Sequence, residues 1–216
     1  MAKLKLCVII SGRGSNLQSL IDACAKDDYP AQIALVVSNI GGAHGLERAK
    51  AAGILTSVVS HKDFSSRDSF SDSMTEAIMP FDVDLICLAG FMRILSDKFV
   101  DHWQDRLINI HPSLLPSFKG LDVQQRAIDS GVRFSGCTVH FVRRDMDTGP
   151  IIVQAAVPVL GHDDANTLAT RILEQEHRIY PLAVKLIAQG RTTIKNERVL
   201  INGGIAPDGV PINPKA

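Results

Sequence analysis

Two polar side chains near the middle of the chain have the chemistry to stabilise an oxyanion and to move a proton. Asn109 and His111 stand two residues apart at the end of an apolar run, 107–110, which predicts a short strand. Because side chains alternate along a strand, both lie on one face. An amide N–H suits an oxyanion and an imidazole suits proton transfer. A lone histidine here is more often structural, but the long Asn-x-His-Pro-Ser-Leu-Leu-Pro context favours catalysis.

A third candidate, Asp147, lies in a hexapeptide at 145–150 whose composition predicts a turn. An aspartate in such a turn either bonds its own backbone or folds over His111 and orients the ring. Sequence spacing leaves both readings open.

A glycine-rich turn follows the first apolar run of the chain, 6–10. Gly12 and Gly14 flank Arg13, and Ser15 and Asn16 begin a helical pattern. Glycines let the backbone approach a ligand, and the free N–H groups at a helix start attract phosphate. The alternative is a tight turn with Ser15 or Asn16 as a helix cap. Arg13 either adds a phosphate contact or faces water. The pattern lacks the third glycine of a dinucleotide site, and no Gly-Lys-Ser follows as in a P-loop.

An acidic residue, Glu176, shares one face of a predicted long helix with Ile172, Ile179 or Tyr180, and Ala183. A carboxylate on an apolar stripe needs a partner, either within the protein or in a bound ligand.

These residues must be positioned by alternating strands and helices. Strands are expected at 6–10, 33–37, 55–59, 83–89, 107–110, 138–142 and 151–159. Helices are expected at 15–26, 46–52, 66–78, 123–130 and 165–189, the last with a possible kink at Pro181, and a small hairpin near 199–204. The order predicts an α/β fold: an open, mostly parallel twisted sheet with helices on both faces and an antiparallel element in the C-terminal half.

Length and composition set the class of protein. The 216 residues fit one domain, 1–216, with a core at about 4–190 and a tail at 191–216. Lys plus Arg and Asp plus Glu each total 23, so any anion must be met by a local site rather than by net charge. The four cysteines form no C-x-x-C pair, and we expect reduced, buried thiols. The short N-terminal apolar run predicts neither a signal peptide nor a membrane span, and hence a cytoplasmic protein.

Several sequence blocks resemble one known family. They are residues 11–18, 88–95, 109–116, 140–142 with 147–150, and 175–181. In order and spacing they are similar to the signature blocks of the phosphoribosylglycinamide formyltransferases, within the folate-dependent formyltransferase superfamily and its Rossmann-like fold. The resemblance implies transfer of a formyl group from 10-formyltetrahydrofolate to the amine of glycinamide ribonucleotide, in purine synthesis and without a metal.

The resemblance also implies a role for each matching residue. Asn109, His111 and Asp147 would form the catalytic trio. The ribonucleotide would be held by the turn and the acidic helix residue: Gly12, Arg13, Gly14, Ser15, Asn16 and Glu176, the last on the ribose hydroxyls. The folate would be held by Arg67, Met92, Arg93, Ile94, Leu95, Asn109, Arg143, Arg144, Asp145, Met146 and Asp147.

Other functions were weighed against this one. A formyltetrahydrofolate hydrolase or an inactive nucleotide-binding protein of the same fold remains an alternative. A methionyl-tRNA formyltransferase needs an RNA-binding domain and a basic surface, which a short tail and zero net charge do not supply. The incomplete glycine fingerprint argues against a dehydrogenase. The expected partners are the two small-molecule substrates, with no nucleic acid or membrane, and the expected state is a monomer or weak homodimer.

Overall fold

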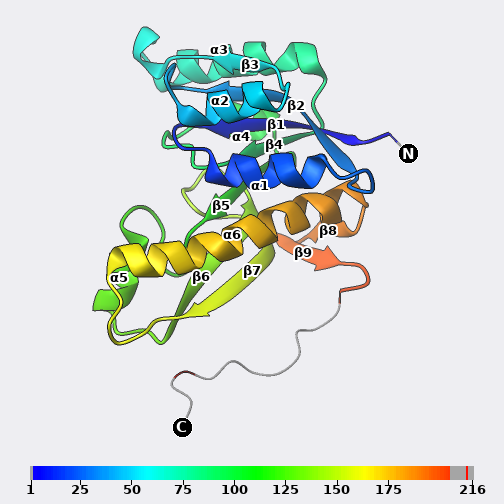
Figure 1. The fold of residues 1–216 in the computed structure, drawn as a ribbon. Helices are drawn as coiled ribbons and strands as arrows, with labels where there is room; N and C mark the ends of the chain where they lie inside the picture. Colours follow the sequence, from blue (N-terminus) through cyan, green and yellow to red (C-terminus); the bar gives the residue numbers. More distant parts are fainter. Residues whose placement is uncertain (1, 205–212, 214–216) are drawn as a thin grey trace.

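Seven strands form one sheet in the order β3-β2-β1-β4-β5-β6-β7 (Figure 1). The structure, a computed structural model, describes residues 2–204 and 213. Strands β1 to β5 run parallel, whereas β6 pairs antiparallel with both β5 and β7. The strands are β1 Leu4–Ile10, β2 Ala31–Ser38, β3 Thr56–Val58, β4 Leu85–Leu88, β5 Leu107–His111, β6 Phe134–Phe141 and β7 Ile151–Pro158. The predicted fold class is therefore confirmed.

Helices cover both faces of this sheet, because its central strands are apolar on both sides. Strand β1 shows the alternation: Leu6 and Val8 join the core with α1, α2, α5 and α6, whereas Cys7 and Ile9 join the core with α3 and α4. The helices are α1 Ser15–Cys24, α2 His44–Ala51, α3 Arg67–Ile78, α4 Asp97–His102, α5 Val123–Asp129 and α6 Ala165–Ala188, with 3-10 turns η1 His61–Asp63 and η2 Met79–Phe81. Among the described helices, none has the length and apolar character to span a membrane.

Two elements differ from the sequence prediction. Helix α4 was not predicted, because six residues are too few to display a helical period, although Ser96 caps it by accepting a hydrogen bond from the Phe99 N–H at 3.2 Å. Strand β6 begins at Phe134 instead of Thr138. The earlier start was not predicted because the segment contains Gly136, and glycine usually weakens a strand. Here a Cβ would meet the Ala155 carbonyl oxygen at 1.9 Å, so only glycine allows β7 to approach.

A hairpin follows the long helix α6, which continues through Pro181. Strands β8 (Thr192–Lys195) and β9 (Arg198–Ile201) form a separate two-stranded sheet. The two turn residues, Asn196 and Glu197, have φ of 52° and 55°, which matches the right-handed twist of a tight hairpin. The predicted hairpin is confirmed but lies further upstream. Most of the predicted tail beyond it, residues 205–212 and 214–216, lies outside the described residues.

Candidate active site

The catalytic candidates lie where β5 ends beside β6. Asn109 pairs with Leu88 of β4 on one side and with His140 of β6 on the other, and His111 pairs with Thr138. His111 is 6 % exposed, so its ring is held by protein groups rather than water. The carboxyl ends of β1, β4 and β5 share this edge of the sheet, which is where ligands bind in open α/β folds.

Asp147 lies against His111, which decides between the two readings that its sequence position left open. One carboxylate oxygen, Oδ1, is 3.4 Å from Nδ1 of His111, and the other accepts a hydrogen bond from the Gly120 N–H at 2.7 Å. The second ring nitrogen, Nε2, donates to the Phe118 carbonyl at 3.0 Å. Asp147 reaches this place with a left-handed φ of 51°. A tertiary contact thus holds the carboxylate on the ring.

His140 completes the polar cluster, although no role is predicted for it from the sequence. It is 1 % exposed, and its Nδ1 faces the carbonyls of Phe141 and Thr148 at 3.0 and 3.1 Å. Two acceptors require a proton on Nδ1, so Nε2 is left as an acceptor for the Asn109 amide at 3.5 Å. Burial lowers the pKa of His140, which favours this neutral ring. His140 therefore orients the Asn109 amide group. One N–H of that amide points to the His140 ring, and the other is not bonded to the ring.

The loop over His111 is shaped by Arg126, a second residue without a predicted role. Its guanidinium donates to the carbonyls of Lys119 and Leu121 at 2.5 and 3.3 Å and lies 5.8 Å from the centre of the Phe118 ring. These contacts hold a segment in which Phe118 and Asp122 both have left-handed φ values, 53° and 54°. The loop thereby presents the Phe118 carbonyl and the Gly120 N–H to the cluster.

The glycine turn is held by backbone contact. Gly14 is the N-cap of α1 with a φ of 69°, and a Cβ there would lie 2.7 Å from the Gly45 Cα. The Gly45 N–H donates to the Gly12 carbonyl at 3.0 Å. Gly14 itself is the N-cap, and no side chain of the described residues caps α1, so the interpretation of Ser15 or Asn16 as a helix cap is not supported. The first N–H groups of the helix are therefore available to an anion.

Glu176 has a partner within the protein: the Asn16 amide donates to its Oε2 at 2.6 Å. Both side chains are buried, and the Asn16 Oδ1 atom has no hydrogen-bond partner among the described residues. Burial raises the pKa of Glu176, and the bond from Asn16 opposes that rise. The pair joins α1 to α6 directly behind the glycine turn. Arg13 is exposed, and its carbonyl accepts from Arg48 Nε at 3.0 Å.

The predicted folate residues occupy two segments beside the cluster. After β4, Met92 and Ile94 are 67 % and 60 % exposed, whereas Leu95 is buried. Met146, in the loop after β6, is 58 % exposed. Apolar side chains left in solvent around a polar cluster fit a flat heteroaromatic ligand. Arg67, the first residue of α3, and the loop residue Asp145 are also exposed.

The predicted folate arginines are engaged with protein groups. Arg143 donates to Glu197 of the β8–β9 turn at 2.7 Å and to Asp105 at 2.8 Å. Arg144 donates to Asp101 at 2.9 and 2.5 Å, and Arg93 contacts Nε2 of His61. The structure thus places all three near the site but in contact with other side chains.

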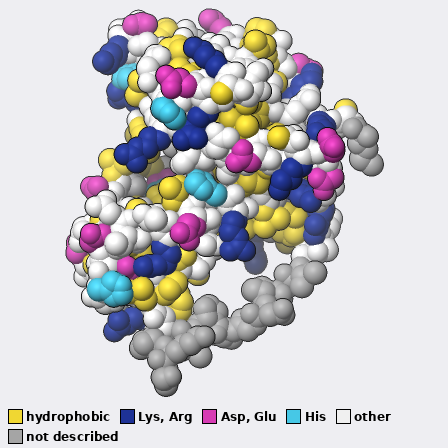
Figure 2. Space-filling model, viewed as in Figure 1, with side chains coloured by type: hydrophobic (Ala, Val, Ile, Leu, Met, Phe, Trp, Pro, Cys, Tyr) yellow, Lys and Arg dark blue, Asp and Glu magenta, His cyan; other side chains and the backbone are white. Residues whose placement is uncertain are grey.

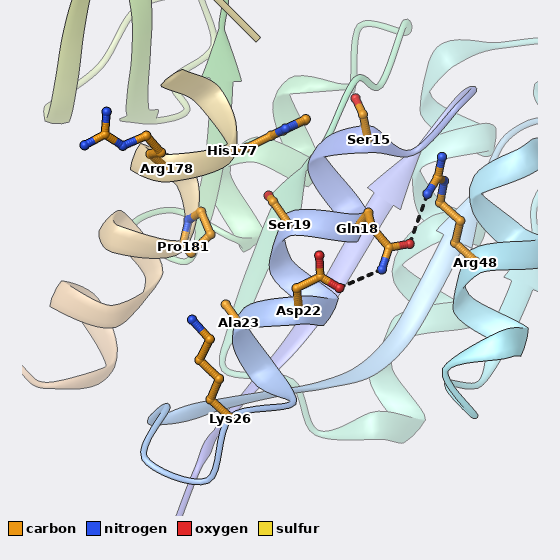
Figure 3. Close-up of a pocket in the computed structure, with 10 residues that line it drawn as sticks. All are labelled: Ser15, Gln18, Ser19, Asp22, Ala23, Lys26, Arg48, His177, Arg178 and Pro181. Atoms are coloured by element: carbon orange, nitrogen blue, oxygen red, sulfur yellow. Dashed lines mark hydrogen bonds between the residues drawn. The ribbon is translucent and has the colours of Figure 1, made fainter. Parts of the chain in front are cut away.

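An open groove lies beside the glycine turn rather than over His111 (Figure 3). Its volume is about 590 Å³, and it runs between α1 and α6 from Ser15 to Lys26, with His177 and Arg178 on the opposite wall. The catalytic candidates do not line it, since the loops described above bury His111 and Asp147. Figure 2 shows basic and acidic side chains interspersed over this face, in keeping with the balanced charge. Among residues 2–204, no three His, Cys, Asp or Glu side chains are grouped to hold a metal ion.

Comparison with known proteins gives a consistent answer. A family model described as formyl transferase matches residues 4–184. The phosphoribosylglycinamide formyltransferases of Haemophilus influenzae and Escherichia coli are 44 % and 42 % identical, each over 94 % of this chain and 96 % of theirs. The chain also matches the trifunctional purine biosynthetic protein adenosine-3 of Gallus gallus, at 49 % identity over 89 % of this chain, and spans 19 % of that protein's length.

A solved structure agrees with the sequence relatives. Glycinamide ribonucleotide transformylase 1 of Symbiobacterium toebii superposes with a TM-score of 0.90 at 45 % identity, over 92 % of this chain and 94 % of that one. The resemblance noted from the sequence blocks is therefore confirmed by comparisons that extend over nearly the whole chain. The chain belongs to the formyl transferase family.

Proposed function

We propose that this chain transfers the formyl group of 10-formyltetrahydrofolate to the amine of glycinamide ribonucleotide, giving N-formylglycinamide ribonucleotide and tetrahydrofolate in purine synthesis. The named relatives that match end to end support this activity. The His111–Asp147 contact beside Asn109 is the observation that carries it, because an amide, an imidazole and a carboxylate in one cluster suit acyl transfer.

The residues have distinct roles in this proposal. Asn109 donates its free N–H to the formyl oxygen as negative charge develops there, and His140 keeps that amide in orientation. His111, held by Asp147, carries the proton from the attacking amine to the leaving folate nitrogen. Such proton transfer is typically worth about 10²- to 10⁴-fold in rate. Losing an oxyanion donor costs about 3–4 kcal/mol in the barrier.

The two substrates have complementary places. The uncapped start of α1, with Gly12, Arg13, Gly14 and Ser15, suits the ribonucleotide phosphate, and the buried Asn16–Glu176 pair suits its ribose hydroxyls. The exposed apolar side chains after β4 and in the β6–β7 loop suit the pterin, whose pocket includes the backbone at 92–95.

Free cysteines at all four positions, three buried and Cys24 partly buried, support a reducing, cytoplasmic location.

The test is spectrophotometric: release of tetrahydrofolate from 10-formyltetrahydrofolate with and without glycinamide ribonucleotide. Release that requires the ribonucleotide is the expected result. Release without it would favour the hydrolase. A formyltetrahydrofolate deformylase from Pseudomonas syringae shares the fold at 23 % identity and a TM-score of 0.85, over 66 % of its length. No release in either condition would favour an inactive nucleotide-binding protein.

A further inference from the structure

Ser11 connects the glycine turn to the segment after β4. Its hydroxyl donates to Asn39 Oδ1 at 2.7 Å and accepts from the Met92 N–H at 2.8 Å. Its backbone N–H donates to the Gly90 carbonyl at 3.2 Å. Ser11 and Asn39 are 7 % and 3 % exposed, so water cannot replace these bonds without opening the sheet edge.

The network extends to a third segment through His61. Arg93 contacts His61 Nε2. The other ring nitrogen, Nδ1, lies against Asn39, 3.2 Å from its carbonyl oxygen and 3.1 Å from its Nδ2. The ends of β1 and β2, the η1 turn and the segment after β4 are thus joined by one set of polar contacts, which is buried at Ser11 and Asn39, partly buried at the Met92 N–H and His61, and exposed at Arg93.

We propose that Ser11 is a positioning residue that couples the two substrate sites, so that each ligand strengthens binding of the other. The inference rests on the proposed function, which assigns the turn at 12–16 to the ribonucleotide and residues 92–95 to the folate. A ligand that orders one segment also orders the other through Ser11, and the second ligand then loses less conformational freedom on binding. Such coupling is reciprocal.

The neighbouring serine provides a matched control. Ser38 is fully buried at the end of β2, and its hydroxyl also makes two hydrogen bonds, one donated and one accepted. Both partners are backbone groups of Ile40, two residues further along, so these two bonds of the Ser38 hydroxyl stay within one segment. Ser38→Ala therefore also removes a buried hydroxyl with two hydrogen bonds near the same sheet edge, but it leaves the bonds from Ser11 to Asn39 and Met92 intact. Ser11→Cys, of similar size but a weaker hydrogen-bond former, serves if Ser11→Ala does not fold.

The experiment is calorimetric titration of tetrahydrofolate with and without saturating glycinamide ribonucleotide, a pair that cannot react because no formyl group is present. In the unmodified protein and in Ser38→Ala, we expect the ribonucleotide to tighten tetrahydrofolate binding by about fivefold or more. In Ser11→Ala the ratio falls toward one, and in Ser11→Cys it falls between. A ratio of one in the unmodified protein, or an unchanged ratio in Ser11→Ala, would overturn the inference.

Hydrogen exchange of the ligand-free protein measures the hydrogen bond from the Met92 N–H to Ser11 directly, without any ligand or reaction. Ser11→Ala should speed exchange of the Met92 amide by about tenfold, as expected for one lost hydrogen bond, while Ser38→Ala leaves it unchanged. An unchanged Met92 amide in Ser11→Ala would remove the physical basis of the coupling. If the unmodified protein bound neither ligand, the proposed function itself would fail, whereas binding of both without coupling would contradict this inference alone.

Discussion

The two sides of the proposed site, one assigned to the ribonucleotide and one to catalysis, are built by different means. The turn at 12–16 is one continuous segment, held because the backbones of Gly14 and Gly45 touch. The catalytic side brings together β5, β6 and two loops, and its polar groups are held by one another: Asp147 lies between His111 and the Gly120 N–H. Changes in the turn should therefore act on stability and binding, and changes in the cluster should act on rate.

The largest expected effect tests the catalytic side. His111→Ala should lower kcat by about 10²- to 10⁴-fold, because the proton carrier is lost, and Asp147→Asn should act in the same direction. The free energy of unfolding should change little in Asp147→Asn, since its amide oxygen can still accept from the Gly120 N–H. Steady-state kinetics and urea unfolding of the same preparations measure both.

The control for this change is His44→Ala. His44 is exposed, and its Nε2 lies 3.9 Å from Oε2 of Glu47. It should keep normal turnover. A folded His111→Ala protein with near-normal kcat would remove His111 from the mechanism.

The turn offers the sharpest stability test. Gly14→Ala should lower the free energy of unfolding by about 1–3 kcal/mol, because it forces a left-handed φ on alanine and presses Cβ against the Gly45 backbone. Gly12→Ala should change the free energy of unfolding by no more than about 0.5 kcal/mol, since no atom of residues 2–204 lies within 4 Å of the position its Cβ would take. Urea unfolding compares the pair. Equal losses in both would mean that the Gly14–Gly45 contact does not fix the turn.

Glu176→Gln tests the buried Asn16–Glu176 pair, which lies behind the glycine turn. We expect KM for the ribonucleotide to rise by about tenfold or more with kcat little changed, because hydrogen bonds to a charged acceptor are worth about 1.5–3 kcal/mol. Equal loss of kcat and kcat/KM would place Glu176 in the chemical step instead.

The pH dependence of this residue follows from its raised pKa. A carboxyl that holds its proton more tightly in the folded state stabilises the fold below the ordinary glutamate pKa. That contribution is lost as pH rises through the raised value. Urea unfolding across this window should show a decline in the unmodified protein that Glu176→Gln lacks, and parallel profiles would contradict it.

The smallest expected effect concerns the hairpin. Glu197→Gln weakens the ion pair with Arg143, whose loop carries Asp147. Because the Glu197 side chain is 62 % exposed, the loss in stability should be at most about 1 kcal/mol and should shrink in high salt. Thermal unfolding at low and high salt measures it. A larger, salt-independent loss would mean that the hairpin supports the loop through packing.

The difference between one continuous turn and a cluster assembled from separate segments explains what could be predicted from the sequence. Short apolar runs and helical patterns identified the strands and long helices, and the glycine turn could be identified because its residues are contiguous in sequence. The Asp147 contact could not be decided, since it depends on two loops that contain left-handed residues other than glycine: Phe118 and Asp122 in one loop and Asp147 itself in the other. His140 could have been predicted, because it lies in the block at 140–142 that resembles the family. The bond from Asn16 to Glu176 joins distant segments, and spacing alone does not reveal it.

The central claim is that the cluster at the end of β5 transfers a formyl group to the ribonucleotide held by the turn. The most direct measurement is tetrahydrofolate release with and without glycinamide ribonucleotide, in the unmodified protein and in His111→Ala. We expect release only with the ribonucleotide, and a loss of about 10²-fold or more in the variant. Equal release without the ribonucleotide, or an unaffected variant, would contradict it.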